Sequence, residues 1–203
     1  MDDTEAEPTN LRYVGPVFEE DDTATAWDPP WPLDHSDPLV VVGLGSSYMH
    51  HEAAVERAGE ALDGLPVRAV ITTGFGLDPD EIRVPPEVLV RRYIPHVALM
   101  PHASLVVTHG GMGTVLAATA YGVPMLCMPL GRDQPEIAAR VEALGAGRTI
   151  HLEAPVEEIR SAISDALESD ELRAGARRMA EVIAGYEKGA RAIEELEGLL
   201  PTG

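Results

Sequence analysis

A cluster of glycines with a histidine in front of it stands near the middle of the sequence. The stretch THGGMGT follows an apolar run, opens a helix-like segment, and contains His109, Gly110, Gly111, Gly113 and Thr114. Glycines in such a turn let backbone N–H groups approach an anion at the positive end of the helix. The Thr114 hydroxyl and the His109 ring add further donors. The pattern indicates a phosphate site or, with equal weight, a tight strand-to-helix turn with an incidental histidine.

Two common nucleotide motifs do not fit the glycine-rich stretches. A dinucleotide fingerprint requires G-x-G-x-x-G, but Tyr48 and Leu116 stand where the third glycine of GLGSSY and GMGTVL should be. A P-loop requires Gly-Lys-Ser/Thr, and neither stretch contains a lysine. Hydride transfer with a dinucleotide and hydrolysis of a nucleoside triphosphate are therefore disfavoured.

The elements around the glycines alternate between strands and helices. We expect strands at 39–44, 67–74, 87–94, 104–109, 124–129 and 146–152. We expect helices near 54–65, 113–122, 134–145 and 156–169, a short turn or helix over 96–103, and one or two terminal helices kinked near Gly185 and Gly189. Strands that are apolar on both faces and alternate with helices predict an α/β fold with a doubly wound, Rossmann-like parallel sheet.

The topology predicts where a ligand would bind. In an open parallel sheet, ligands bind beyond the carboxyl ends of the strands. This brings the stretches GLGSSY, YIPH and THGGMGT to one crevice, and the Asp133-Gln134 pair follows the next strand to join them.

Composition limits the classes of partner. The chain of 203 residues has a net charge of -19, with 34 acidic against 15 basic residues, so a nucleic-acid surface is improbable. Cys127, the single cysteine, lies in an apolar run and is expected to be a buried, inert thiol. No leader or membrane span is recognised, so a soluble protein of the reducing cytoplasm is expected.

The acidic residues are concentrated at the start of the chain. Eleven of the 34 precede Pro38, against Arg12 as the only base there. We therefore expect residues 1–37 to form an acidic linker or arm, and residues 38–203 to form one domain with C-terminal helices.

The stretch from Tyr93 to Gly147, YIPHVALMPHASLVVTHGGMGTVLAATAYGVPMLCMPLGRDQPEIAARVEALGAG, resembles the donor-binding half of the inverting GT-B glycosyltransferases that use nucleotide-diphospho-sugars. The resemblance extends over about 39–150 and implies the single C-terminal half of a GT-B fold. Such enzymes decorate antibiotics, plant metabolites and lipids.

The resemblance assigns roles to particular side chains. An aromatic residue in this family stacks on the nucleobase and its motif partners reach the ribose, which implicates Tyr93, Pro95 and His96. The histidine before the glycines contacts the diphosphate, and the Asp-Gln pair binds sugar hydroxyls. The residues implicated near the diphosphate and the sugar are Ser46, Ser47, His109, Gly111, Met112, Gly113, Thr114, Asp133 and Gln134.

The Asp-Gln assignment agrees with the chemistry of its groups. A carboxylate accepts hydrogen bonds and an amide both donates and accepts, which suits vicinal hydroxyls. Taken alone, Asp133 and Gln134 could equally be a helix N-cap and its neighbour.

One departure from the family pattern bears on the nucleotide. Many members that use uridine nucleotides carry a glutamate eight residues after the motif histidine, where it grips both ribose hydroxyls, and this chain has Ala117. A donor without a 2′-hydroxyl would not need that grip, so we expect a dTDP-sugar to be favoured over a UDP-sugar.

The resemblance also implies what the chain would need as a partner. The chain starts at the position of the family's interdomain linker, so we expect the acceptor-binding domain and its catalytic histidine base to lie outside the chain. No catalytic residue is therefore assigned. The chain alone is expected to be inactive, and no metal or other cofactor is expected. A non-catalytic nucleotide-sugar binding module and one subunit of a two-chain glycosyltransferase are the alternatives.

Two other groups of polar residues are expected to have structural roles and not to bind a ligand. Asp78 and Asp80 match the D-x-D pattern of metal-dependent transferases, but the proline between them favours a surface turn. His50 and His51 are expected to face solvent or to cap a helix.

Overall fold

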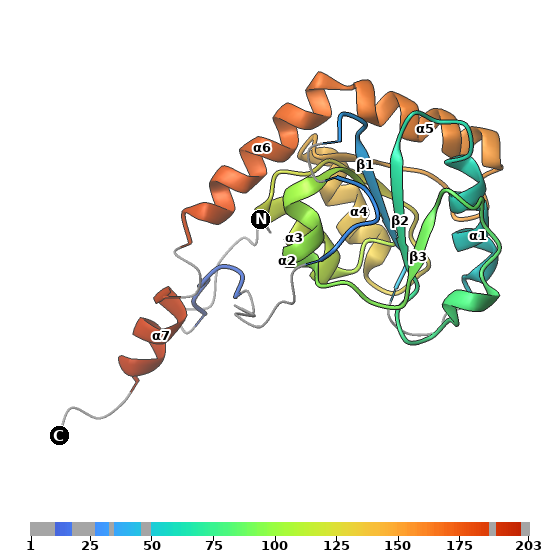
Figure 1. Ribbon diagram of the computed structural model, residues 1–203. Helices are drawn as coiled ribbons and strands as arrows, with labels where there is room; N and C mark the ends of the chain where they lie inside the picture. The colour runs from blue at the N-terminus through green and yellow to red at the C-terminus, as the bar shows by residue number, and fades with distance from the viewer. Residues whose placement is uncertain (1–10, 18–26, 33–34, 46–49, 187–189, 200–203) are drawn as a thin grey trace.

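The core of the protein is a parallel sheet. The computed structural model describes residues 11–17, 27–32, 35–45, 50–186 and 190–199. Within them, six parallel strands run in the order β3-β2-β1-β4-β5-β6 (Figure 1). Their bounds are β1 Leu39–Gly43, β2 Arg68–Thr72, β3 Leu89–Arg91, β4 Ala103–Thr108, β5 Met125–Cys127 and β6 Gly147–Thr149. The predicted doubly wound α/β fold is confirmed.

Helices cover both faces of the sheet. Their bounds are α1 Glu52–Ala61, α2 His96–Leu99, α3 Met112–Ala120, α4 Gln134–Ala143, α5 Val156–Glu168, α6 Asp170–Ala184 and α7 Ala190–Glu197, with short 3-10 turns η1 Pro79–Glu81 and η2 Met100–His102. Helices α1 and α5 pack on one face, and α3, α4 and α6 lie on the other (Figure 1).

The alternation of side chains along β1 explains this arrangement. Val40 and Val42 join the core cluster of α1 and α5, whereas Leu39 and Val41 join the cluster on the opposite face. Successive side chains of a strand point to opposite faces, so a strand covered on both sides must be apolar throughout. The run LVVV meets that requirement, and all four side chains are buried.

The strand order creates the crevice predicted from the sequence. From β1 the chain proceeds to β2 on one side, and it later returns to β4 on the other side of β1. The connections that follow β1 and β4 therefore diverge at the carboxyl edge of the sheet, which leaves room for a ligand between them.

The elements differ from expectation mainly at their ends. Strand β3, at the edge of the sheet, is shorter than the predicted 87–94, because residues 85–88 form a turn in which the Val88 N–H donates to the Pro85 carbonyl oxygen at 3.0 Å. Gly185 is the C-cap of α6, so it ends that helix where we expected a kink, and Gly189 lies outside the described residues. Helix α7 follows beyond the end of α6, away from the sheet (Figure 1).

Part of the N-terminal segment contacts the domain. Trp27 and Trp31 pack against the core cluster of the α3 face, and their rings meet edge to face at 6.1 Å. Large aromatic surfaces gain free energy from such burial, which explains why this part of residues 1–37 lies against the body of the protein.

Cys127 is fully buried in the same cluster. Burial raises the pKa of its thiol to about 12, and the nearby Glu142 adds to that rise. The prediction that this thiol is buried is confirmed. None of the helices in the described ranges combines the length and apolar character needed to cross a membrane.

Gly175 is the position where the packing of α6 is most sensitive to an added methyl group. A Cβ at Gly175 would overlap the carbonyl oxygen of Gly145, which is backbone and cannot turn aside. We predict that Gly175→Ala lowers the free energy of unfolding by about 1–3 kcal/mol, as overpacking does. For a chain of this size each kcal/mol corresponds to about 2–4 °C in Tm.

The matched control adds the same methyl group elsewhere in a helix. A Cβ at Gly113 would meet nothing within 4 Å, so Gly113→Ala should leave Tm unchanged or slightly raised. Equal Tm values for Gly175→Ala and the wild type in thermal unfolding would contradict the packing described here.

Candidate functional site

A cleft of about 300 Å³ lies at the carboxyl edge of the sheet, between the ends of β1, β2 and β4. Eight of the residues singled out from the sequence line it. They are Tyr93, His96, His109, Gly111, Met112, Gly113, Thr114 and Gln134. Pro95 is the N-cap of α2 beside them, Asp133 directly precedes Gln134, and Ser46 and Ser47 lie outside the described residues.

The glycine turn connects β4 to α3 and is shaped by two constraints. Gly110 has a φ of +85°, in the left-handed region that favours glycine, and its N–H donates to the Thr108 hydroxyl at 3.2 Å. A Cβ at Gly110 would also lie 3.1 Å from the carbonyl oxygen of Gln134. The absence of a side chain thus lets the turn approach the start of α4 closely.

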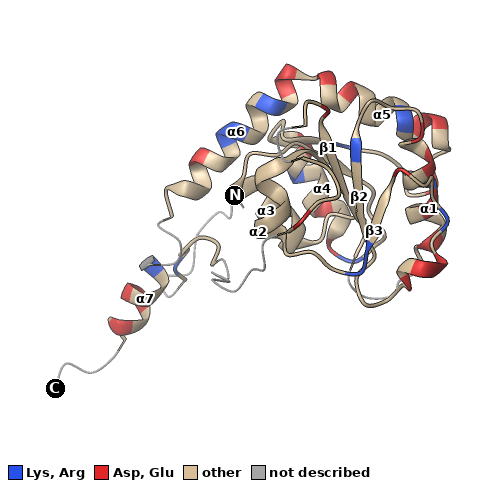
Figure 2. Ribbon diagram, viewed as in Figure 1, with Lys and Arg blue, Asp and Glu red and all other residues tan. Residues whose placement is uncertain are grey.

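The N-terminus of α3 is open toward the cleft. Gly111 is its N-cap and makes no side-chain capping hydrogen bond. The first backbone N–H groups of a helix have no partner within the helix, so those of Met112, Gly113 and Thr114 are available to a ligand. Helix α3 also contains no charged residue, although acidic side chains are frequent on α1, α5 and α6 (Figure 2). No carboxylate on α3 therefore offsets the positive end of its dipole.

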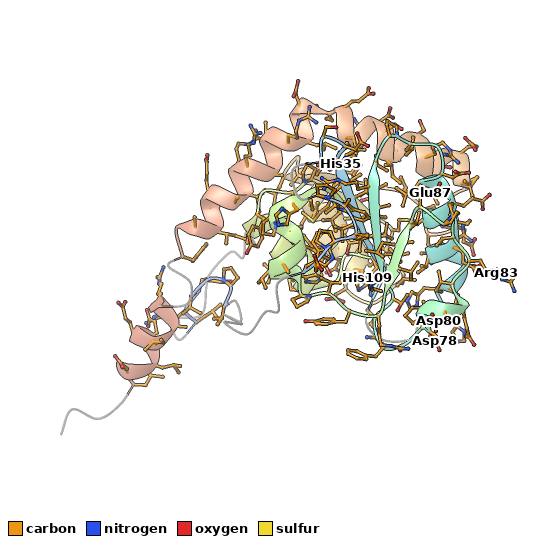
Figure 3. All side chains as sticks on the ribbon, viewed as in Figure 1. His35, Asp78, Asp80, Arg83, Glu87 and His109 are labelled. Carbon is orange, nitrogen blue, oxygen red and sulfur yellow. The ribbon has the colours of Figure 1, made fainter. Side chains whose placement is uncertain are left out.

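His109 lies beside this helix terminus, toward the middle of the molecule (Figure 3). Its Nδ1 is 3.5 Å from the carbonyl oxygen of Gly43 at the end of β1, and its ring lies so close to Gly111 that a Cβ there would overlap Nε2. Burial lowers the pKa of His109, and the nearby His51 lowers it further. The hydrogen bond to Gly43 and the charge of Asp133 raise this pKa but do not cancel the effect of burial. The imidazole is therefore neutral at pH 7, with Nε2 left for a ligand.

The environment of His51 differs from the one expected from the sequence. It occupies the N-cap position of α1, but its side chain makes no capping hydrogen bond, and only 2% of its surface is exposed. Burial lowers its pKa, partly opposed by Glu52. The expectation of a solvent-facing or capping residue was wrong, because the helix turns this side chain inward toward His109. His50 is exposed, with a φ of +55°.

Gln134 uses one half of its amide to hold the loop that precedes it. Its Oε1 accepts hydrogen bonds from the N–H groups of Leu130 at 2.8 Å and Gly131 at 3.0 Å, and the residue is 4% exposed. The amide nitrogen is the part left to donate to a ligand. Asp133 stands at the N-cap of α4 without capping it, and it is exposed. Its carboxylate is therefore available, and the capping interpretation does not hold.

Two stacked aromatic rings stand at the rim of the cleft. Tyr93 is 64% exposed, and its ring stacks on that of Phe75 at a centroid distance of 6.3 Å and an interplanar angle of 23°. Phe75, 73% exposed, was missed from the sequence. Phe75 could have been predicted from its position two residues after the Thr-Thr pair at the end of β2. That position lies at the carboxyl edge of the sheet, where the cleft is.

Two arginines of the cleft were also missed. Arg92 and Arg132 both line it, and Nη2 of Arg92 lies 3.4 Å from Oδ1 of Asp78. Arg132 precedes the Asp-Gln pair and is exposed. A basic residue beside that pair in a strongly acidic chain was the available signal. His96 opens α2 and is half-buried, which lowers its pKa.

The D-x-D stretch is a structural turn. The Asp78 carboxylate accepts a hydrogen bond from the Asp80 N–H at 3.3 Å and thereby caps the 3-10 turn η1. Both aspartates lie at the outer edge of the molecule (Figure 3). Across the described part of the chain, no group of three or more His, Cys, Asp or Glu side chains could hold a metal ion.

A second hollow, of about 470 Å³, lies between the N-terminal segment and α7, lined by Arg12, Val14, Ala192, Glu195, Leu196 and Leu199. It contains none of the residues predicted to bind a ligand.

Comparison with known proteins agrees with this arrangement. The family model described as "Erythromycin biosynthesis protein CIII-like, C-terminal domain" matches residues 56–199. The 4'-demethylrebeccamycin synthase of Lentzea aerocolonigenes is 35% identical over 95% of this chain and 46% of its own length. UDP-glycosyltransferase 2 of Phaeomoniella chlamydospora is 36% identical over 79% of this chain and 37% of its own length.

A solved structure shares the fold and part of the sequence. CalG4, the calicheamicin glycosyltransferase, superimposes with a TM-score of 0.80 at 30% identity, over 92% of this chain and 47% of that chain. The chain thus spans about half the length of the relatives it matches. It belongs to the family of erythromycin biosynthesis protein CIII-like C-terminal domains, the donor-binding half of GT-B glycosyltransferases.

Proposed function

We propose that the cleft binds a nucleotide-diphospho-sugar, with dTDP favoured over UDP, for inverting transfer of the sugar to a small-molecule hydroxyl. The close approach of Gly110 to the Gln134 carbonyl carries this proposal. It brings the donors at the start of α3 next to the Asp133-Gln134 pair. A diphosphate on the first and a sugar on the second would then be neighbours, as they are in such a donor.

The leaving group would be stabilised by the groups at the start of α3. As an acceptor hydroxyl attacks the anomeric carbon, negative charge grows on the departing diphosphate. The N–H groups of Gly113 and Thr114 and the Thr114 hydroxyl are preorganised donors for that charge. Nε2 of His109 becomes a further donor when the imidazole takes up a proton beside the diphosphate. Asp133 and the Gln134 amide nitrogen would hold the sugar so that its anomeric carbon faces the acceptor.

The nucleoside would lie at the rim formed by Tyr93, Pro95 and His96. Tyr93 presents an exposed ring on which a base could stack, and Phe75 supports the opposite side of that ring. Ala117 on α3 is half-buried and offers no acceptor to a ribose 2′-hydroxyl. A uridine ribose would bring a hydroxyl to this place, whereas the deoxyribose of dTDP would not.

The acceptor and its catalytic base would come from outside this chain. The chain corresponds to 46% of the rebeccamycin relative and 47% of CalG4, and we propose that the remaining half of such an enzyme binds the acceptor. By itself the chain would bind donor without transferring the sugar.

We predict that isothermal titration finds dTDP binding to the purified chain, with UDP binding about fivefold or more weakly and GDP and NAD not at all. The difference follows from the cost of about 1 kcal/mol or more for a buried hydroxyl without a partner. Ala117→Glu supplies that partner and should shift the preference toward UDP. UDP binding as tightly as dTDP to the wild type would contradict the preference.

We predict that His109→Ala weakens dTDP binding by about ten- to a hundredfold, as expected for the loss of a hydrogen bond to a charged group. Binding of thymidine should change by less than about twofold, because the nucleoside lies at the other end of the cleft. His35→Ala, which removes an exposed histidine of the N-terminal segment, is the control. Equal losses for dTDP and thymidine would argue against the diphosphate contact.

The affinity for a dTDP-sugar should rise as the pH falls from 8 toward 6. In the free protein burial holds the pKa of His109 below its ordinary value of 6.5. A bound diphosphate favours the imidazolium and raises that pKa, so binding takes up a proton. Titrations in buffers of different ionisation enthalpy measure this uptake. It should be reduced in His109→Gln, and an unchanged uptake there would assign the proton to another group.

A further inference from the structure

Arg132 is held at the cleft in a conformation that side-chain-bearing residues rarely adopt. It lines the cleft, it is exposed, and its φ is +59°. Glycine would adopt this left-handed conformation without strain, so the fold alone gives no reason for an arginine here.

The loop that carries Arg132 is fixed on both sides. Gln134 accepts hydrogen bonds from Leu130 and Gly131 before it, and the carbonyl oxygen of Gln134 lies against Gly110 of the glycine turn. The backbone of Arg132 therefore stays beside the turn that leads into α3. A guanidinium on this backbone is within reach of an anion at the start of that helix.

Arg132 is also the cleft's available positive charge. The cleft-lining cations within the described ranges are Arg92 and Arg132, and Arg92 is paired with Asp78. Arg132 makes no hydrogen bond or ion pair with any residue that the structure describes. In a chain with a net charge of -19, an unpaired guanidinium in the cleft is a specific feature that calls for an anionic partner.

We propose that Arg132 binds the diphosphate of the donor and remains paired with it as the nucleoside diphosphate departs. This inference rests on the proposed function and adds a residue to it. The planar guanidinium can give two parallel hydrogen bonds to phosphate oxygens and keeps its charge at every relevant pH. The backbone donors of α3 and His109 would hold the diphosphate from one side, and Arg132 from the other.

The test compares Arg132→Gly and Arg132→Gln with the wild type in titrations with thymidine, dTMP and dTDP. Both variants should bind dTDP about tenfold or more weakly and thymidine as the wild type does, with a smaller salt dependence for dTDP. Arg132→Lys should recover part of the loss, since it restores charge without the planar fork. Arg148→Gln, which removes an exposed arginine of β6, should bind every ligand normally.

Thermal unfolding separates a binding role from a structural one. Arg132→Gly relieves the left-handed conformation and should have a Tm equal to or above that of the wild type while it binds dTDP poorly. Wild-type affinity of both variants for dTDP would overturn the inference and leave the proposed function standing. Parallel losses for thymidine and dTDP would also overturn it, because they indicate a disturbed cleft. A wild-type chain that binds no dTDP would overturn the proposed function and this inference together.

Discussion

The site depends on the backbone contact between the glycine turn after β4 and the start of α4. Gly110 takes its left-handed conformation without strain because it has no side chain, and a Cβ there would lie 3.1 Å from the Gln134 carbonyl oxygen. Gln134 in turn fixes residues 130 and 131 through its Oε1. This contact sets the spacing between an open helix terminus, which suits a phosphate, and a carboxylate-amide pair, which suits hydroxyl groups. Each half alone is common in proteins, and their adjacency is what indicates a nucleotide-diphospho-sugar.

Electrostatics explain how so acidic a chain could hold an anion. Acidic residues are frequent on α1, α5, α6 and α7 and in the N-terminal segment, while α3 is uncharged. The positive charge that the cleft offers is therefore local: the end of a helix dipole, an exposed arginine and a histidine that can gain a proton. His109 and His51 lie near each other, and burial lowers the pKa of both. Burial thus favours the neutral form of both, and His109, which lines the cleft, would gain a proton more readily beside a bound anion.

Much of the fold could be predicted from the sequence, because its signals are local. The apolar LVVV run of β1 and the helical spacing of apolar residues in α1 predict which of their side chains are buried. The alternation of strands and helices implies a parallel sheet. The glycine turn and the Asp-Gln pair were recognisable because residue type and order carry their chemistry. The features that the sequence did not reveal depend on contacts between distant segments. His51 is buried near His109, and Phe75 stacks on Tyr93 although the two residues follow different strands. The Oε1 of Gln134 is occupied by N–H groups of the loop before it, which leaves only the amide nitrogen for a ligand.

The most direct measurement is the change of backbone amide chemical shifts when dTDP is added to the isotopically labelled chain. We expect the largest changes at Met112, Gly113 and Thr114, further changes near Tyr93 and at Gly131, and little change along α5 and α6. Changes that gather instead in the hollow between the N-terminal segment and α7, or the absence of changes at the start of α3, would contradict the placement of the donor in this cleft.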